Sequence, residues 1–163
     1  MHPEFRRITE ESRRLRDRHA PGARLVLLSN AATLHDSAVK AALPLFDDRV
    51  LKLDAGRPED FHAVNLPHRS HNLEQIIQDL IELGKSLPFT LQSLFISGRY
   101  SNATEAAVAA WIAAVARVRP HAVQVYSIER PPAASYVQPV PPQRLQEIAA
   151  RLTEQTGVPA EVY

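Results

Sequence analysis

Lys52 and Asp54 stand in an apolar stretch (VLKLDAG, residues 50–56) that has the composition of a buried strand. Successive side chains of a strand point to opposite faces, so Lys52 and Asp54 share one face and the two leucines share the other. A parallel strand covered by helices on both sides is normally apolar on both faces. We therefore expect the face of Lys52 and Asp54 to meet water, a ligand or the lumen of a barrel.

Two other apolar segments hold a polar residue in mid-strand: Gln92 within residues 89–97 and Gln124 within residues 122–128. Burying such an amide without a partner costs roughly 1–3 kcal/mol, whereas a barrel that holds a ligand can use it. Ligands of parallel α/β sheets bind at the carboxyl ends of the strands. The residues expected there are Ser29-Asn30, Asp54-Ala55-Gly56, Ser97-Gly98-Arg99 and Glu129-Arg130. These small and polar residues predict a ligand-binding rim.

The same residues also permit other interpretations. Lys52 and Asp54 suit a structural ion pair or an edge-strand feature, and a buried Lys52 suits Schiff-base chemistry if burial lowers its pKa. Gln92 and Gln124 suit hydrogen bonds to backbone groups or water. The sequence leaves these alternatives open.

The segment HRSH, residues 68–71, spaces two histidines as in some metal sites. It is polar and has no neighbouring carboxylate, so we expect His68 and His71 to be solvated and predict no metal site. No Gly-x-Gly-x-x-Gly, Walker A or Gly-x-Ser-x-Gly pattern occurs. The chain has no cysteine, which excludes disulfides, a thiolate nucleophile and a thiolate-bound zinc ion or iron–sulfur cluster.

The composition is that of an ordinary globular chain. Its 163 residues suggest one domain, and hydrophobic residues make up 45% of it. The net charge is +1, which gives no field to recruit nucleic acid or a membrane surface. No apolar run is long enough to span a bilayer, and the charged N-terminus has no secretory signal core. We therefore expect a cytoplasmic protein.

Strand and helix patterns alternate along the chain. Helices are expected at about residues 3–19, 37–43, 59–64, 73–83, 105–118 and 143–156. Strands are expected at about residues 24–30, 49–55, 89–97, 122–128 and 159–163. The expected helix N-caps are Asp36 or Ser37, Asn72, and Asn102 or Thr104. The proline-rich residues 130–142 are expected to form a loop over the strand ends. This order predicts an α/β fold with parallel strands and right-handed crossovers.

Four of these segments resemble consecutive strand motifs of radical S-adenosylmethionine (radical SAM) proteins. They are LLSNA (27–31), KLDA (52–55), LQSLFISG (91–98) followed by Asn102, and VQVYSIERP (123–131). The most similar group reads TNG, KLDA, IQTLFVRG and VQIYTIDRP in the same order. The tail, residues 156–163, resembles the end of that domain, so the match covers nearly the whole chain.

The resemblance implies a partial (β/α) barrel: an open, curved parallel sheet of four to five strands with helices on its outer face. Residues 1–163 would form a single incomplete barrel domain. In the family, S-adenosylmethionine and a [4Fe–4S] cluster are held partly by a Cys-x-x-x-Cys-x-x-Cys loop and a Gly-Gly-Glu-like motif. Neither motif is present here, so we expect this chain alone to bind no cluster. The positions carried over by resemblance are Asn30, Asp54, Gly98, Asn102 and Tyr126 for the cofactor, and Lys52 and Arg130 for the substrate.

The first functional hypothesis is a radical SAM-like fragment or split subunit with no catalytic residue of its own. Its partner would be a chain that supplies the missing half, or a second copy joined through the open sheet edge, because open edges template association. The alternatives are a non-catalytic binding or interaction module that uses the polar concave face, and an enzyme with a Schiff-base lysine at Lys52.

Overall fold

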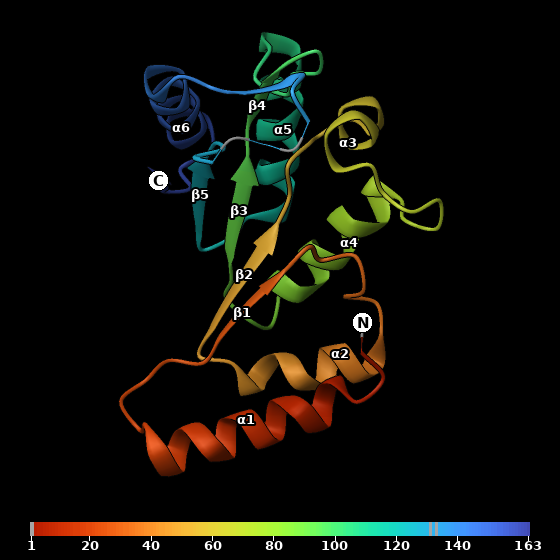
Figure 1. Cartoon of the computed structure of the whole chain (residues 1–163), viewed down its shortest axis with the longest axis vertical. Coiled ribbons are helices and arrows are strands. Elements are labelled where there is room, and N and C mark those ends of the chain that lie inside the picture. Colours follow the sequence, from red (N-terminus) through yellow and green to blue (C-terminus); the bar gives the residue numbers. More distant parts are fainter. Residues whose placement is uncertain (1, 131, 133) are drawn as a thin grey trace.

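A computed structural model describes residues 2–130, 132 and 134–163. Its main sheet has five parallel strands in the linear order β1-β2-β3-β5-β7, with β1 and β7 at the edges (Figure 1). These strands are β1 (Val26–Ser29), β2 (Asp48–Lys52), β3 (Thr90–Leu94), β5 (Ala122–Tyr126) and β7 (Ala160–Val162). The α/β fold with an open parallel sheet predicted from the sequence is confirmed, and the arrangement is consistent with a partial barrel.

The described residues also form six α-helices and one 3₁₀ helix, of which α1 precedes β1 and the others lie between strands. They are α1 (Phe5–His19), α2 (Ser37–Ala42), η1 (Leu43–Leu45), α3 (Pro58–Asn65), α4 (Leu73–Gly84), α5 (Glu105–Val118) and α6 (Pro142–Thr156). The Asp36 carboxylate caps α2 by accepting from the amide of Ala38, and Asn72 caps α4 in the same way. None of the described helices is both long and apolar enough to cross a bilayer.

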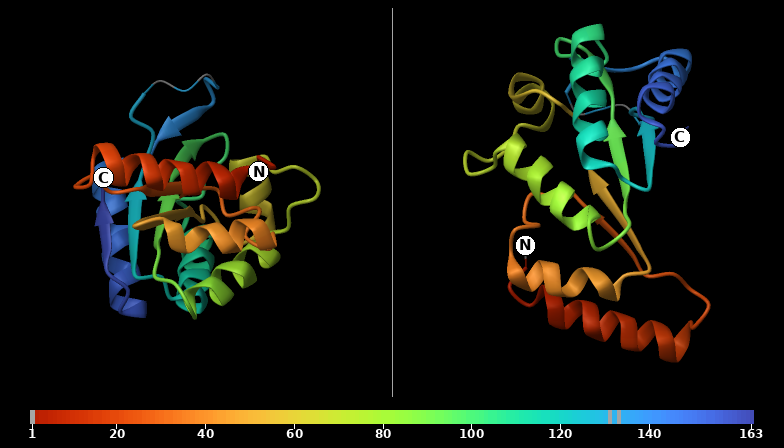
Figure 2. Two further views of the ribbon diagram at one scale, coloured as in Figure 1. Left: turned by 90° about the horizontal axis from the view of Figure 1, so that it is seen from below. Right: turned by 180° about the vertical axis from the view of Figure 1, so that it is seen from behind.

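The helices α4, α5 and α6 gather on one face of the sheet, which Figure 2 (right) shows from behind. Alternate strand residues that point into this layer, such as Leu51, Leu91 and Val123, are almost fully buried. The core is centred on Trp111 of α5, which packs edge-to-face on Phe95 at 5.1 Å between ring centroids. The opposite face is open, and Leu28 on it is 67% exposed.

A close backbone contact fixes α5 against the end of β2. A side chain at Gly56 would collide with the backbone of Ala110, so only glycine permits this approach. The indole N–H of Trp111 donates to the carbonyl of Leu53 at 3.0 Å, which satisfies a buried donor and ties the same two segments together. The carboxyl end of β2, where the candidate site lies, is therefore held in place by α5 on the covered face of the sheet.

A short antiparallel ribbon differs from the sequence-based expectation. The strand expected at residues 89–97 divides into β3 and β4 (Ile96–Gly98). The division occurs because the amide of Ile96 donates to the Asn102 side chain and not to a neighbouring parallel strand. β4 then pairs with β6 (Val137–Pro139), in the segment expected to be a loop. Figure 2 (left) shows this ribbon standing away from the sheet on the side opposite α4 to α6.

Candidate functional site

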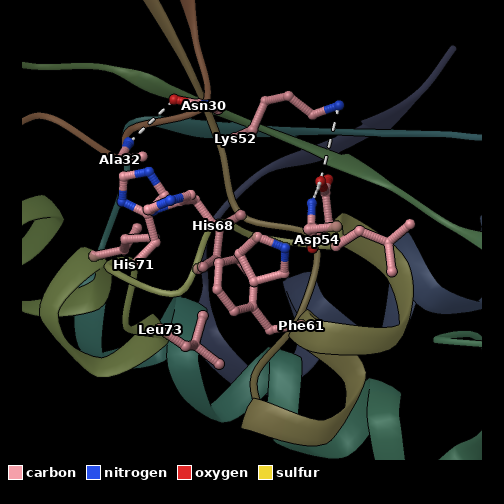
Figure 3. Close-up of a pocket in the computed structure, with 13 residues that line it drawn as sticks. Asn30, Ala32, Lys52, Asp54, Phe61, His68, His71 and Leu73 are labelled. Carbon is pink, nitrogen blue, oxygen red and sulfur yellow. Dashed lines mark hydrogen bonds and ion pairs between the residues drawn. The ribbon is translucent and has the colours of Figure 1, made fainter. Parts of the chain in front are cut away.

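A pocket of about 380 Å³ opens at the carboxyl ends of β1 and β2, against the connection between α3 and α4. We call it the rim pocket. Figure 3 shows its lining, in which Asn30 and Lys52 lie above Phe61 and His71. The apolar part of its wall comes from Leu53, Phe61, Leu66, Pro67, Leu73 and Ile76. The pocket thus combines an apolar wall with a few converging polar groups, which is the usual make-up of a small-molecule site.

The Asp54 carboxylate is enclosed at the back of the rim pocket, with 2% of its side chain exposed. Oδ1 accepts a hydrogen bond from the amide of Leu94 at 2.8 Å, and Oδ2 accepts one from the Asn65 side chain at 2.6 Å. Burial raises the pKa of Asp54, against the opposing effects of the Lys52 ammonium and these two donors. Asp54 therefore joins the ends of β2 and β3 to the end of α3.

Lys52 reaches across the open face from β2. Its Nζ donates to the Tyr126 hydroxyl at 2.7 Å, lies 5.3 Å from the centre of that ring, and is 3.8 Å from Oδ2 of Asp54. Burial lowers the pKa of Lys52, but the Asp54 charge and the Tyr126 hydroxyl outweigh burial, so the pKa is raised overall. The amine is protonated at neutral pH, which is opposite to the lowered pKa that Schiff-base chemistry requires.

Asn102 is buried and its amide is fully engaged with the backbone. Oδ1 accepts from the amide of Ile96 at 2.8 Å, and Nδ2 donates to the carbonyls of Asp54 and Leu94 at 2.8 and 2.7 Å. The cap of α5 is Thr104, whose hydroxyl accepts from the amide of Ala107. Asn102 is thus a structural tie between strand ends, and its predicted cofactor contact stays a prediction.

The structure brings some predicted site residues together and leaves others apart. Asn30, Lys52 and Asp54 line one pocket, and Tyr126 joins them through Lys52. Gly98 lies in the ribbon with φ of +110°, where a side chain would collide with the carbonyl of Tyr136. Arg130 is exposed in the loop after β5 and does not line the pocket.

The turn after β1 presents Asn30 at the pocket mouth. Its Oδ1 accepts from the amide of Ala32 at 3.2 Å, which makes a local side-chain turn. The residue between them, Ala31, has φ of +62°, a left-handed conformation that costs a non-glycine residue roughly 1–2 kcal/mol. The similar motif TNG has glycine at this place, so the backbone geometry accounts for that glycine.

Gln92 and Gln124 lie side by side in the strand register, in a row that runs from Lys52 across to Glu161. The Gln92 amide donates to the side-chain oxygen of Gln124 at 3.1 Å. The two mid-strand amides therefore satisfy each other in part, where the sequence suggested backbone or water as partners. The row gives the open face a polar centre.

Sequence reasoning missed several residues of the site. Asn65 had no recognisable signal, because it reaches Asp54 only through the packing of α3 on the strand end. Leu66 and Pro67 enter the pocket from a segment expected only to be irregular. His68 and His71 line the same pocket, yet among the described residues no group of three or more histidine, aspartate or glutamate side chains could hold a metal ion.

The donor set does not fit a [4Fe–4S] cluster. Such a cluster is held by cysteine thiolates, and the sequence has none. No chemical step through a cluster can be assigned to this chain's own residues.

Comparisons with known proteins give matches among solved structures. No protein-family model matches the sequence, and no curated protein matches it. A radical SAM methyltransferase from Sphaerobacter thermophilus has a TM-score of 0.60 at 17% identity, over 72% of this chain and 34% of the methyltransferase. A domain of pyruvate-formate lyase-activating enzyme from Bacteroides vulgatus ATCC 8482 has a TM-score of 0.69 at 12% identity, over 100% of this chain and 96% of that domain.

A third solved structure, TYW1 with a lysine-pyruvate adduct bound, has a TM-score of 0.70 at 13% identity over 95% of this chain. The chain spans about a third of the methyltransferase and just under half of TYW1. At these identities the likeness concerns the fold alone. The chain has the fold of radical SAM enzymes, which confirms at the level of the fold the resemblance found in its strand motifs.

Proposed function

We propose that this chain is a radical SAM-like ligand-binding domain that provides one side of a site for S-adenosylmethionine and does not cleave it with its own residues. The observation behind the proposal is that Asn30, Lys52 and Asp54 converge on the rim pocket at the strand ends. The radical SAM fold of the neighbours supports this choice of ligand. Thiolates for a cluster would have to come from residues other than these 163.

The side chains of the rim pocket differ in what they offer a ligand. Asp54 is enclosed and its oxygens are already used, so its role is to hold Lys52 in place as a cation. Lys52 is 30% exposed and retains donor capacity beyond Tyr126. Asn30 is exposed and its amide nitrogen makes no protein bond among those described, so it also faces the ligand.

The chemistry of S-adenosylmethionine matches this donor set. Its carboxylate suits the Lys52 ammonium, its ribose hydroxyl oxygens can accept from the Asn30 amide nitrogen, and its adenine ring suits an apolar wall that includes Phe61. One side of a site binds weakly, because the other contacts are lacking. We therefore expect a dissociation constant of roughly 0.1–1 mM for the chain by itself.

Titration calorimetry with S-adenosylmethionine and S-adenosylhomocysteine tests the proposal. Lys52→Met should weaken binding at least about fivefold, since it removes a charged hydrogen bond of about 1 kcal/mol or more. Lys40→Met is the matched control, because Lys40 is exposed on α2 and does not line the rim pocket. Absence of binding at millimolar ligand, or equal binding by Lys52→Met, would show that the pocket does not serve this ligand.

The second half of the proposal concerns cleavage. Anaerobic reconstitution with iron and sulfide should leave the purified chain without a stoichiometric cluster absorbance. A stable cluster, or release of 5′-deoxyadenosine under reduction, contradicts it.

A second candidate is a non-catalytic module that binds through the open face. The row from Lys52 through Gln92 and Gln124 favours it, because Gln92 and Gln124 lie outside the rim pocket and give the open face a polar centre. Calorimetry with ADP separates the two candidates. Binding of ADP that depends on Gln124, together with no binding of S-adenosylmethionine, favours the module.

A further inference from the structure

Four half-buried polar side chains lie together at the centre of the open face. Lys52, Gln92 and Gln124 are neighbours in the register of β2, β3 and β5, the three central strands of the sheet (Figure 1). Tyr126 follows Gln124 at the next position of β5 on the same face. Because these strands are central, the set does not depend on what lies beside either edge of the sheet.

The two glutamines retain hydrogen-bonding capacity for a ligand. The amide nitrogen of Gln92 donates to the side-chain oxygen of Gln124 at 3.1 Å, which uses one of the two oxygens of the pair. The oxygen of Gln92 and the nitrogen of Gln124 make no protein hydrogen bond among the described residues. If both amides turned over, the bond would reverse and the count would stay the same. The pair therefore offers one acceptor oxygen with N–H donors beside it.

The groups on the β2 side of the pair add further donors. The Lys52 ammonium has three N–H groups and no lone pair, and it donates one bond to the Tyr126 hydroxyl at 2.7 Å. Because the Tyr126 oxygen accepts this bond, its own proton points away from Lys52 and can be donated to a ligand. The Asp54 carboxylate is enclosed with both oxygens engaged. On the other side, Glu161 lies exposed in the edge strand and accepts from the Tyr163 hydroxyl. The centre of the open face thus has several donors around one amide acceptor.

We propose that this part of the open face binds a cyclic imide, a ring in which one N–H lies between two carbonyl groups, as in uracil and hydantoin. The ring N–H donates to the acceptor oxygen of the glutamine pair. One ring carbonyl accepts from the glutamine N–H groups, and the other accepts from Lys52 or Tyr126. A carboxylate would leave the glutamine oxygen without a donor. An adenine edge has an amino group where the imide has a carbonyl, so that donor would face other donors.

A segment of protein backbone matches this set less well than a ring does. In a trans peptide the N–H and the C=O point in opposite directions, so one peptide unit cannot reach an acceptor and the donors beside it along a single edge. In a ring the amide is held cis, and its N–H and C=O point the same way. The imide site goes beyond the proposed function, because it lies beside the rim pocket and does not require S-adenosylmethionine to bind there.

The side-chain amide signals of Gln92 and Gln124 in ¹H–¹⁵N correlation spectra report binding directly. Uridine and hydantoin should both shift these signals to saturation, with a dissociation constant of roughly 1–10 mM for a few hydrogen bonds on an open face. Two unrelated imides separate recognition of the imide from recognition of the ribose. 3-Methyluridine lacks the ring N–H and should bind at least about fivefold more weakly, because the glutamine oxygen then loses its donor. Cytidine, with an amino group in place of one carbonyl and no ring N–H, should be weakened likewise.

Gln124→Leu should weaken uridine binding at least about fivefold, because it removes the donor group and the partner of Gln92. Gln92→Leu provides a second variant, so that misfolding of one does not decide the result, and circular dichroism checks each fold. Gln146→Leu is the matched control, since Gln146 is exposed on α6, which covers the other face of the sheet. Both β-strand variants should still bind S-adenosylmethionine, because neither glutamine lines the rim pocket. Failure of the imide site is thereby distinguished from failure of the proposed function.

Weaker binding of uridine by both β-strand variants, with Gln146→Leu like the wild type, supports the imide site. Equal binding by the wild type and both variants overturns it, as does equal binding of uridine and 3-methyluridine. Binding of ADP that is tighter than that of uridine and depends on Gln124 overturns the choice of an imide. No binding of either imide at concentrations up to about 50 mM also overturns it and leaves the glutamine pair to another chain.

Discussion

The Nζ of Lys52 donates a hydrogen bond to the hydroxyl of Tyr126 at 2.7 Å, which joins β2 to β5 across the intervening strand β3. Nothing in the sequence alone indicates that these two residues, 74 positions apart, are in contact. The contact gives Lys52 a fixed position and, with Asp54, a fixed charge. It links the rim pocket to the far side of the open face.

Tyr126→Phe should lower the pKa of Lys52, since it removes one of the two groups that raise it. A lysine whose pKa is raised on folding gives stability that is present below its ordinary pKa of 10.5 and is lost as the pH rises through the folded value. The loss at neutral pH should be at most about 1 kcal/mol, because Lys52 is partly exposed. NMR titration of ¹³C-methylated lysines measures the pKa, with exposed Lys40 as the reference signal. A rise in the Lys52 pKa would contradict the prediction.

Asp54→Asn should destabilise the chain by about 1–3 kcal/mol. Asparagine keeps only one of the two acceptor oxygens of Asp54. Its N–H₂ group therefore faces either the backbone N–H of Leu94 or the side-chain N–H₂ of Asn65, and a buried donor loses its partner. Urea denaturation measures the change. Asp36→Asn is the control, because aspartate and asparagine cap a helix about equally well and Asp36 is exposed. Equal stability of the two variants would be evidence against the Asp54 network.

The difference in stability between the wild type and Asp54→Asn should depend on pH with a sign that the pKa of Asp54 sets. Burial raises the pKa of Asp54 in the folded chain above 3.8, so the folded state binds the proton more readily than the unfolded state. The stability due to this group is full below pH 3.8 and declines as the pH rises through the folded pKa. The advantage of the wild type over Asp54→Asn should therefore be larger at about pH 4 than at about pH 7. An advantage that grows with pH would mean that the folded pKa is depressed.

Asn102→Ala should be among the most damaging single substitutions, at about 3 kcal/mol or more. It leaves the amide of Ile96 and the carbonyls of Asp54 and Leu94 without their partner in a buried place. Thr104→Ala, two residues away, removes only the cap of α5 and should cost about 1 kcal/mol. Thermal and urea unfolding of both variants give the comparison. A cost for Asn102→Ala no larger than that for Thr104→Ala would show that water replaces the amide.

Gly56→Ala should destabilise the chain by roughly 1–3 kcal/mol, because the added methyl group collides with the backbone of Ala110. Gly22→Ala is the control, since nothing lies within 4 Å of a side chain there. The difference between the two variants in urea denaturation isolates the collision from the general effect of replacing glycine. A neutral Gly56→Ala would require α5 to move away from the end of β2.

The salt bridge between Glu74 of α4 and Arg117 of α5 should contribute modestly to stability, and its contribution should disappear in acid. Hydrogen bonds from Arg117 and Gln78 lower the pKa of Glu74 to about 2 from 4.5. Its contribution is thus present above pH 4.5 and lost as the pH falls through about 2. Glu74→Gln should cost no more than about 1 kcal/mol at neutral pH, and less in high salt. Glu82→Gln makes the same charge change on α4 without removing the bridge to α5, and serves as the control.

Much of the fold could be predicted because it rests on local signals. Alternating strands and amphipathic helices, together with caps such as Asn72, fix the order of elements. The shared face of Lys52 with Gln92 and Gln124 also follows from the two-residue repeat of strands. The ribbon of β4 and β6 did not follow, since its pairing joins Ser97 to the distant Gln138 and no local pattern of the proline-rich segment indicates it.

The site was only partly predictable for a related reason. The strand pattern placed Asn30 and Asp54 at strand ends and Lys52 in mid-strand on the same face as Asp54, and the strand ends of a parallel sheet meet at one rim. What each side chain does there depends on neighbours that are far away in the chain. Asn102 or Thr104 was expected to cap a helix; Thr104 does so, and the three hydrogen bonds of Asn102 go to the backbone, while its cofactor contact stays a prediction. The role of a polar residue is decided by which unsatisfied group lies nearest, and tertiary packing sets that.

The ties made by Asp54 and Asn102 have a consequence for how such motifs are interpreted in other genomes. Both side chains are needed to keep the strand ends in register with the turns that follow them. A chain with this fold would be selected to retain them whatever its chemistry, because their loss destabilises the fold. Their presence in a newly sequenced gene is thus explained by the fold, and it is not evidence for or against catalysis.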